Sequence, residues 1–161
     1  MEQALHQAEI ALAEGEFPVG CVLVAADEIV ARGRRMNSRT EPLSELDHAE
    51  IVALRSLAAS RTIVKAPLIA YSTMEPCLMC YASLLLNGVS TMVYAFEDPM
   101  GGGTSLDLQR LSPLYQQMNP NIISGICRSE SLSLFKRFFE NPTSSYWQNS
   151  FLASYTLAQE L

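Results

Sequence analysis

The hydrophobic positions at the start of the chain follow first a helical and then a strand-like pattern. Apolar residues at 4, 5, 8, 11 and 12 recur at the spacing of one helix face, and Gly15 and Pro18 end that helix. A continuous apolar run over 19–25 is typical of a buried strand. After a turn at 26–28, residues 29–31 predict the returning strand. The pattern therefore predicts a helix followed by a β-hairpin.

The middle of the chain alternates polar loops with short apolar segments. Residues 33–47 are mostly polar and predict a loop, and Asp47 is the predicted cap of a helix that begins near His48. A short strand is predicted at 68–71. Pro76 favours the first turn of a second helix, which runs to residue 86 and ends at an Asn-Gly pair.

The last third of the chain predicts further elements of both kinds. They are a strand at 89–96, a loop at 98–103, a helix at 106–118, a strand at 122–126 and a helix at 131–139. This alternation indicates a three-layer α/β/α domain with a central mixed sheet. We expect one domain over residues 1–140. The aromatic residues of 141–161 recur at near-helical spacing, and we expect this tail to pack on the same domain or on a dimer interface.

Composition restricts the class of protein. The 161 residues are 48% hydrophobic and 17% charged, which is typical of a globular chain, and no apolar run approaches the roughly 18 residues that span a bilayer. The first residues lack the basic region of a signal peptide. Two of the four cysteines form a C-x-x-C pair, which suits a reducing compartment better than a disulfide framework. A cytoplasmic location is the expectation.

Charge gives a mixed indication about nucleic acid. The net charge of −6 opposes a nucleic-acid partner on average, because phosphate binding is largely electrostatic. Four of the eleven basic residues nevertheless lie within eight positions: Arg32, Arg34, Arg35 and Arg39. The cluster is either a solvated strand end or a phosphate-binding patch, in which Arg34, Arg35 and Arg39 are the candidate contacts.

Two short motifs carry the chemistry. His48 is followed two residues later by Glu50, and Pro76 directly precedes Cys77, which is followed by Cys80. One imidazole and two thiolates supply three zinc ligands and leave the fourth tetrahedral position to water, as in a catalytic rather than a structural site. We expect one Zn²⁺ per chain, bound by His48, Cys77 and Cys80, and a metal-activated water as the nucleophile.

Glu50 distinguishes an enzyme from a zinc-stabilised fold. A structural site has no use for a free acid beside its histidine, whereas hydrolytic deamination needs a group that moves protons from water to the ring nitrogen and the leaving amine. The alternative is a Glu that merely favours the start of a helix. We expect Glu50 to be the catalytic acid and base.

The motif order H-x-E followed by P-C-x-x-C resembles that of the zinc nucleobase deaminases. Over residues 3–140 the chain also resembles bacterial tRNA adenosine deaminases, notably in the segments 16–24, 48–55 and 71–80. The resemblance implies a cytidine-deaminase-like fold with a mixed five-stranded sheet, adenosine-to-inosine deamination in a tRNA anticodon loop, and a homodimer. It also implies that Asn37, Val19 and the backbone of Ala49 contact the target base.

Two features depart from that family. The loop at 98–100 lacks the family's basic residue, and the end of the chain is almost uncharged and aromatic instead of basic. A small-molecule deaminase of guanine, cytosine or a nucleoside is therefore the main alternative, because a tail packed over the pocket would exclude a stem-loop. A non-catalytic zinc-binding partner subunit is a further alternative, against which Glu50 argues.

Overall fold

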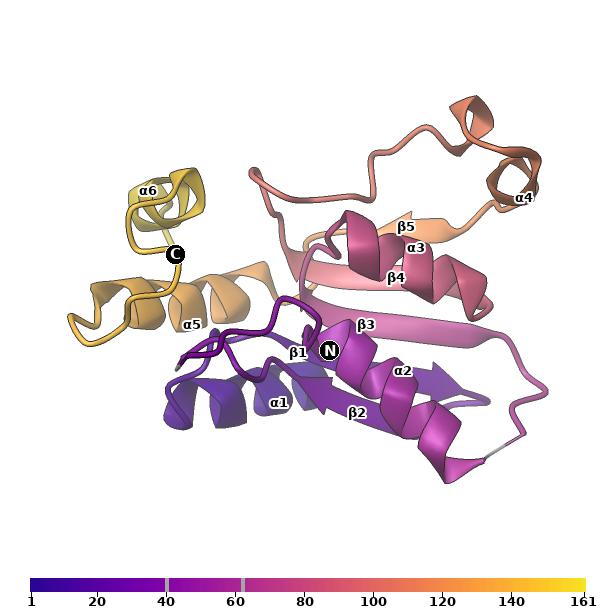
Figure 1. Ribbon diagram of the computed structural model, residues 1–161, viewed down its shortest axis with the longest axis horizontal. Helices are drawn as coiled ribbons and strands as arrows, with labels where there is room; N and C mark the ends of the chain where they lie inside the picture. The colour runs from indigo at the N-terminus through magenta and orange to yellow at the C-terminus, as the bar shows by residue number, and fades with distance from the viewer. Residues whose placement is uncertain (40, 62) are drawn as a thin grey trace.

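A mixed five-stranded sheet in the order β2-β1-β3-β4-β5 forms the middle layer of the computed structural model, which describes residues 1–39, 41–61 and 63–161 (Figure 1). β1 runs antiparallel to β2 and β3, while β3, β4 and β5 are parallel. The strands are β1 (Gly20–Ala25), β2 (Glu28–Arg34), β3 (Leu68–Met74), β4 (Val89–Phe96) and β5 (Asn121–Ile123).

Helices cover both faces of this sheet. α1 (Glu2–Ala13) and α5 (Arg128–Glu140) pack on one face, and α2 (Ala49–Ser60) and α3 (Leu78–Leu86) pack on the other (Figure 1). α6 (Phe151–Ala158) packs against α5. The predicted three-layer α/β/α architecture with five strands is confirmed, and within the described residues no helix is long and apolar enough to span a bilayer.

One predicted helix is wrong. Instead of a helix over 106–118, the chain forms a short 3-10 turn, η1 (Leu108–Arg110), and a single helical turn, α4 (Pro113–Gln116). Pro113 explains the break, because proline has no backbone N–H and disfavours a helical conformation in the residue before it. The Asp107 carboxylate caps η1 by accepting from the Gln109 backbone N–H. β5 also ends earlier than predicted, before Gly125 with its positive φ of 80°.

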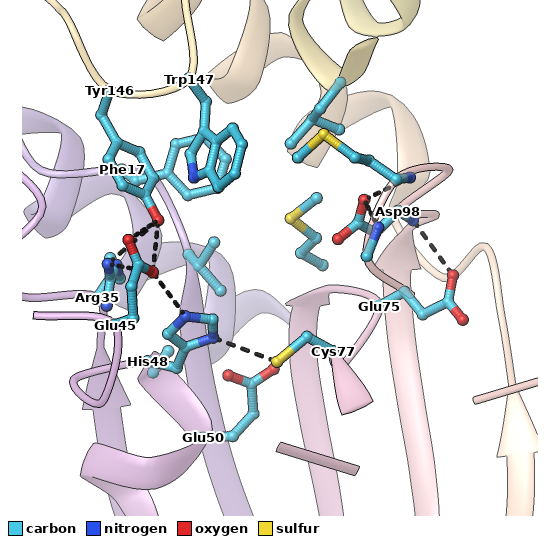
Figure 2. A pocket seen from close by; sticks show the side chains of 16 residues that line it. Phe17, Arg35, Glu45, His48, Glu50, Glu75, Cys77, Asp98, Tyr146 and Trp147 are labelled. Carbon is cyan, nitrogen blue, oxygen red and sulfur yellow. Dashed lines mark hydrogen bonds and ion pairs between the residues drawn. The ribbon is translucent and has the colours of Figure 1, made fainter. Parts of the chain in front are cut away.

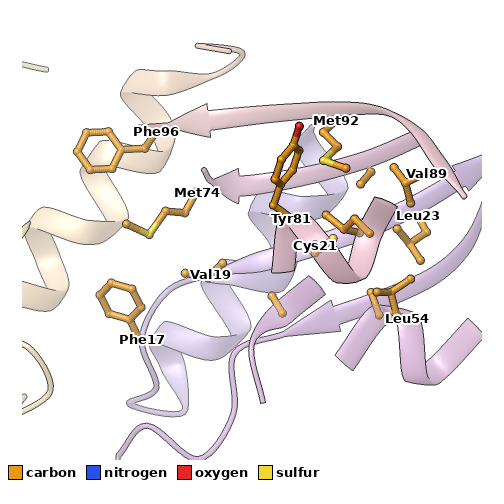
Figure 3. Close-up of a cluster of buried hydrophobic side chains, with 14 of the residues drawn as sticks. Phe17, Val19, Cys21, Leu23, Leu54, Met74, Tyr81, Val89, Met92 and Phe96 are labelled. Carbon is orange, nitrogen blue, oxygen red and sulfur yellow. The ribbon is translucent and has the colours of Figure 1, made fainter. Parts of the chain in front are cut away.

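The core lies on both faces of the sheet and reaches the carboxyl ends of the parallel strands. Figure 3 shows Met74 and Phe96 at those ends, close to Phe17 and Val19, which precede β1. The Phe17 ring packs on Phe135 of α5, with ring centroids 5.2 Å apart. Leu152 and Ala153 of α6 join the same buried cluster, so the tail packs on this domain.

Gly33 allows α2 to sit unusually close to the sheet. A Cβ atom at Gly33 would lie 2.1 Å from the Ala49 carbonyl oxygen and 2.5 Å from the Ala53 nitrogen, far inside van der Waals contact. Only glycine permits this approach of a strand to the first turn of a helix. The position of the α2 N-terminus on the sheet therefore depends on Gly33.

Candidate active site

The three predicted zinc ligands converge where α2 and α3 begin. His48 is the N-cap residue of α2 and Cys77 that of α3, and Cys80 lies in the first turn of α3. His48 Nδ1 lies 3.5 Å from Cys77 Sγ and 3.5 Å from Cys80 Sγ. All three ligand atoms lie within 4.8 Å of one another. Zn–S and Zn–N bonds of about 2.3 and 2.0 Å place two tetrahedral ligands about 3.5 Å apart, so the geometry fits zinc.

The environment of Cys77 favours the thiolate that zinc requires. A hydrogen bond with Cys80, together with His48, lowers the pKa of the Cys77 thiol to about 4. The N-terminus of α3 adds a favourable dipole for negative charge at this position. The same hydrogen bond, together with burial, raises the pKa of the Cys80 thiol, so in the absence of metal one proton is shared between the two sulfurs. Zinc binding has to displace that proton, and the donor set itself is what points to a metal site.

Asp47 does not cap α2 as predicted. The N-cap position belongs to His48, while the Asp47 carboxylate accepts hydrogen bonds from Asn37 Nδ2 at 2.8 Å and from an Arg55 nitrogen at 2.9 Å. Asp47 thereby joins the preceding loop to α2. The prediction placed the cap one residue too early, because His48 itself has the extended backbone of an N-cap residue.

Glu50 lies inside the protein beside the ligands. Its side chain is 3% exposed, and the Ser72 hydroxyl of β3 donates to Glu50 Oε1 at 3.1 Å. Burial raises the pKa of the Glu50 carboxyl, which makes its protonated form more accessible. A carboxyl group that can both accept and return a proton is what general acid and base catalysis requires.

A cavity of about 300 Å³ opens above these residues (Figure 2). His48, Glu50 and Cys77 line it, while Phe17, Met74 and Trp147 give it apolar walls. An apolar cleft with a few convergent polar groups is typical of a small-molecule site. The site therefore combines apolar walls with a polar floor.

The loop predicted at 98–103 is tied to the metal site. The Asp98 carboxylate accepts from the backbone N–H groups of Met100 and Gly101, both at 2.9 Å. Gly102 forms a β-bridge with Cys77. These contacts fix one rim of the cavity next to the candidate zinc ligand Cys77.

The residues that the resemblance implied for base binding are placed differently from one another. Val19 and Ala49 are buried and line the cavity. Asn37 is exposed, donates to Asp47, and is not among the described residues that line the cavity. The structure therefore brings two of the three to the site.

The arginine cluster is not a single surface patch. Arg34 makes two hydrogen bonds of 2.9 Å to the Glu14 carboxylate, and Arg39 is exposed and donates to the Glu14 carbonyl oxygen at 3.1 Å. Arg35 is 2% exposed and lines the active-site cavity. The Arg35 guanidinium is already paired with Ser44, Glu45 and Tyr146, which does not favour a phosphate contact, and the phosphate-binding role of the three arginines stays a prediction.

Sequence reasoning missed several residues of the site, and four of them carry the arguments below. They are Glu45, Ser72, Tyr146 and Trp147. Ser72 belongs to β3 beyond the predicted end of that strand, and a longer strand would have suggested a polar group facing the α2 helix. For Tyr146 and Trp147, the sequence indicated only that the aromatic residues of the tail recur at near-helical spacing. A contact between residues about a hundred positions apart, such as Tyr146 and Glu45, leaves no recognisable pattern in a single sequence.

Comparison with known proteins agrees with this geometry. Residues 1–96 match the family model of the cytidine and deoxycytidylate deaminase zinc-binding region. The tRNA-specific adenosine deaminase of Agrobacterium fabrum is 32% identical over 141 residues, which cover 86% of this chain and 91% of that protein. The enzyme of the same name from Rickettsia bellii is 34% identical over 143 residues, covering 87% and 97%.

A solved structure from a study of A-to-I editing by tRNA:A34 deaminases at the wobble position superposes with a TM-score of 0.70. The two sequences are 31% identical, and the match covers 83% of this chain and 96% of the other. The predicted cytidine-deaminase-like fold is confirmed by this likeness. The chain belongs to the cytidine and deoxycytidylate deaminase family of zinc-binding deaminases, the family that includes its tRNA-specific adenosine deaminase relatives.

Proposed function

We propose that the protein is a zinc-dependent hydrolase that converts adenosine to inosine in a tRNA anticodon loop. The observation that carries the proposal is the buried Glu50 carboxyl beside the converging atoms of His48, Cys77 and Cys80. The similarity to tRNA-specific adenosine deaminases over most of the chain supports the choice of substrate.

The residues of this chain divide the reaction among them. His48, Cys77 and Cys80 would hold Zn²⁺, which supplies a Lewis acid and lowers the pKa of a bound water toward neutrality. Glu50 accepts a proton from the attacking water and delivers protons to the ring nitrogen and the departing amine. The water oxygen replaces the amino group on the ring carbon, and ammonia leaves. Ser72 orients the Glu50 carboxylate through its hydroxyl.

The walls of the cavity hold the base during this exchange. Val19 and Ala49 lie against the space in which a flat ring fits, and Phe17 and Trp147 add aromatic surface. Asn37 remains a candidate base contact. To reach the cavity it must exchange its hydrogen bond to Asp47 for one to the substrate.

The experiment is a parallel product assay of the purified zinc protein. The substrates are an adenosine-containing anticodon stem-loop, free guanine, cytosine, adenosine and cytidine. Efficient formation of inosine in the stem-loop supports the proposal. Conversion of a free base or nucleoside with no deamination of the stem-loop contradicts it.

The tail gives the small-molecule alternative a specific observation. Tyr146, Trp147 and Leu152 line the active-site cavity, and under this alternative the wall that they form excludes a stem-loop. The two functions respond differently to Trp147→Ala. Under the small-molecule alternative, the variant gains activity on the stem-loop because the excluding wall is removed. Under the tRNA proposal, the variant loses an aromatic surface that holds the base, so its activity on the stem-loop does not rise.

A homodimer and a cytoplasmic location form part of the proposal. Large apolar side chains are exposed on α3 and on the segment that follows β4, namely Leu78 at 57%, Leu86 at 53% and Leu114 at 57%. Such surface is typical of a subunit interface, and the reducing cytoplasm keeps zinc-binding thiols available. Analytical ultracentrifugation of the protein and of Leu114→Glu tests the dimer, since a charge at the interface should favour monomers.

A further inference from the structure

The imidazole of His48 has two sides, and each faces different chemistry. Nδ1 faces the sulfurs of Cys77 and Cys80. Nε2 faces Glu45, whose Oε2 atom lies 3.5 Å away, and Figure 2 shows the imidazole between Glu45 and Cys77. A histidine that binds a metal through one nitrogen commonly donates its other N–H to a carboxylate, which fixes the tautomer and the ring orientation. Glu45 stands where that carboxylate is needed.

Glu45 lies on the loop before α2, and its side chain is 59% exposed. An exposed glutamate ordinarily samples several rotamers, so a fixed position requires partners. Two groups supply them. Tyr146 donates its hydroxyl to Glu45 Oε2 at 2.9 Å, and Arg35 donates a guanidinium N–H to the same oxygen at 3.2 Å.

Arg35 and Tyr146 also hold one another. An Arg35 nitrogen donates to the Tyr146 hydroxyl oxygen at 3.2 Å, and the guanidinium carbon lies 5.4 Å from the centroid of the tyrosine ring. Arg35 is anchored further by the Ser44 carbonyl oxygen at 2.7 Å. Its Nε has no hydrogen-bond partner among the described residues, and within them Glu45 is the acid with which this buried cation forms an ion pair.

We infer that Glu45 is a positioning residue for the zinc ligand His48. Tyr146 of the C-terminal tail in turn holds the Glu45 carboxylate in place through its hydroxyl. Tyr146 lies 101 residues from Glu45 in the sequence. The tail is thereby part of the metal centre as well as a wall of the cavity. This inference rests on the proposed function because it concerns the zinc on which that function depends.

Zinc affinity provides the test. The affinities of the purified protein, Glu45→Ala and Glu45→Gln are compared by competition with a chelator, and the melting temperatures of the metal-free proteins are compared alongside. Glu45→Ala should bind zinc about 10–100-fold more weakly, as is typical when such a partner is removed. Glu45→Gln keeps an oxygen that accepts from Nε2–H, so it should restore most of the affinity. Glu28→Ala, which removes an exposed glutamate of the hairpin, is the matched control.

A second variant tests the role of the tail. Tyr146→Phe keeps the ring that packs on Phe17 at a centroid distance of 5.4 Å but removes the hydroxyl. It should weaken zinc binding by a smaller factor than Glu45→Ala, while Tyr115→Phe, outside the active-site cavity, should leave binding unchanged. In proteins loaded with Co²⁺ in place of zinc, the visible absorption of Glu45→Ala should shift because the imidazole is reoriented.

Two outcomes overturn the inference. One is wild-type zinc affinity and an unchanged cobalt spectrum in Glu45→Ala. The other is an equal loss of affinity in Glu45→Ala and Glu45→Gln that follows a fall in melting temperature, since Glu45 would then only compensate Arg35. A protein that deaminates none of the tested substrates but shows the expected zinc affinities contradicts the proposed function alone.

Discussion

The two sides of the active-site cavity are built in different ways. One side consists of the first turns of α2 and α3, where His48, Glu50 and Cys77 lie within short motifs. The other side is formed by Phe17 before β1 and by Tyr146 and Trp147 of the tail, which meet only in the folded chain. The chemistry of the site is thus encoded locally, whereas the shape that selects a substrate depends on long-range packing.

The helix-start side should show the largest effect, through Glu50→Gln. The amide cannot accept and return protons, so kcat should fall by about 10²–10⁴-fold, while zinc content stays near one per chain. The rate of product formation at saturating substrate gives kcat, and metal analysis gives the zinc content. Ser72→Ala removes only the hydroxyl that orients Glu50 and should lose less. A Glu50→Gln protein that kept a tenth of the wild-type rate would move the proton-transfer role to another group.

The next largest effect is expected where the first turn of α2 packs on Gly33 of the sheet. Gly33→Ala introduces a Cβ 2.1 Å from the Ala49 carbonyl oxygen, so the helix must shift, at a cost of about 2–3 kcal/mol in unfolding free energy. Because His48 begins that helix, zinc affinity should fall as well. Urea unfolding and chelator competition measure both.

Gly88→Ala is the control for that variant. Gly88 has a positive φ of 79° and open space around it, so alanine there should cost about 1 kcal/mol through backbone strain alone. Zinc affinity should be unchanged. Equal zinc affinities in the two variants would show that the close approach at Gly33 does not place the ligands.

The same contrast explains how far sequence could predict the structure. The strand at 89–96 and both ligand-bearing helices follow from apolar runs and from proline and glycine signals, and the structure confirms them. The helix expected at 106–118 fails because Pro113 outweighs the apolar periodicity around it. Local pattern is sufficient where a single element decides the outcome.

Long-range contacts account for what sequence could not predict. The four arginines at 32–39 appear alike in the sequence, yet Arg35 is buried and Arg34 pairs with Glu14. Arg35 is the arginine that turns inward, because it pairs there with Glu45 and Tyr146. These two residues are 101 positions apart in the sequence. A single sequence carries no record of that pairing.

The tail side should respond to acid through Glu97. Arg128 and Tyr155 lower the pKa of the Glu97 carboxyl to about 2, and these contacts tie α5 and α6 to the end of β4. A carboxyl group whose pKa is lowered by folding stabilises the protein above its unfolded value of 4.5. That contribution is lost as the pH falls toward 2.

Glu97→Gln should therefore destabilise the protein by about 1 kcal/mol at pH 7, a figure that allows for solvent screening of a partly exposed pair. The difference from wild type should shrink as the pH falls from 4.5 toward 2. Urea unfolding across this range measures it. A deficit that stays constant with pH would assign the effect to packing of the tail instead of to the ion pair.

The smallest expected effect concerns the arginines at the edge of the tail. Arg39 lies in a groove beside Ser144 and Ser145 of the tail, is exposed, and its guanidinium donates only to a backbone carbonyl among the described residues, so it is free to bind a phosphate. Arg34 must first give up its two hydrogen bonds to Glu14.

If the substrate is a stem-loop, Arg39→Gln should therefore weaken its binding a few-fold and reduce the slope of log affinity against log salt by about 0.7–0.9, the value for one lost phosphate contact. Arg34→Gln should change the slope less. Turnover of a free base should be unaffected in both. Arg61→Gln, at the far end of α2, serves as the control for net charge. An equal change of slope in Arg61→Gln and Arg39→Gln would mean that overall charge governs binding, whereas a change confined to Arg39→Gln would place the nucleic acid along the tail side of the cavity.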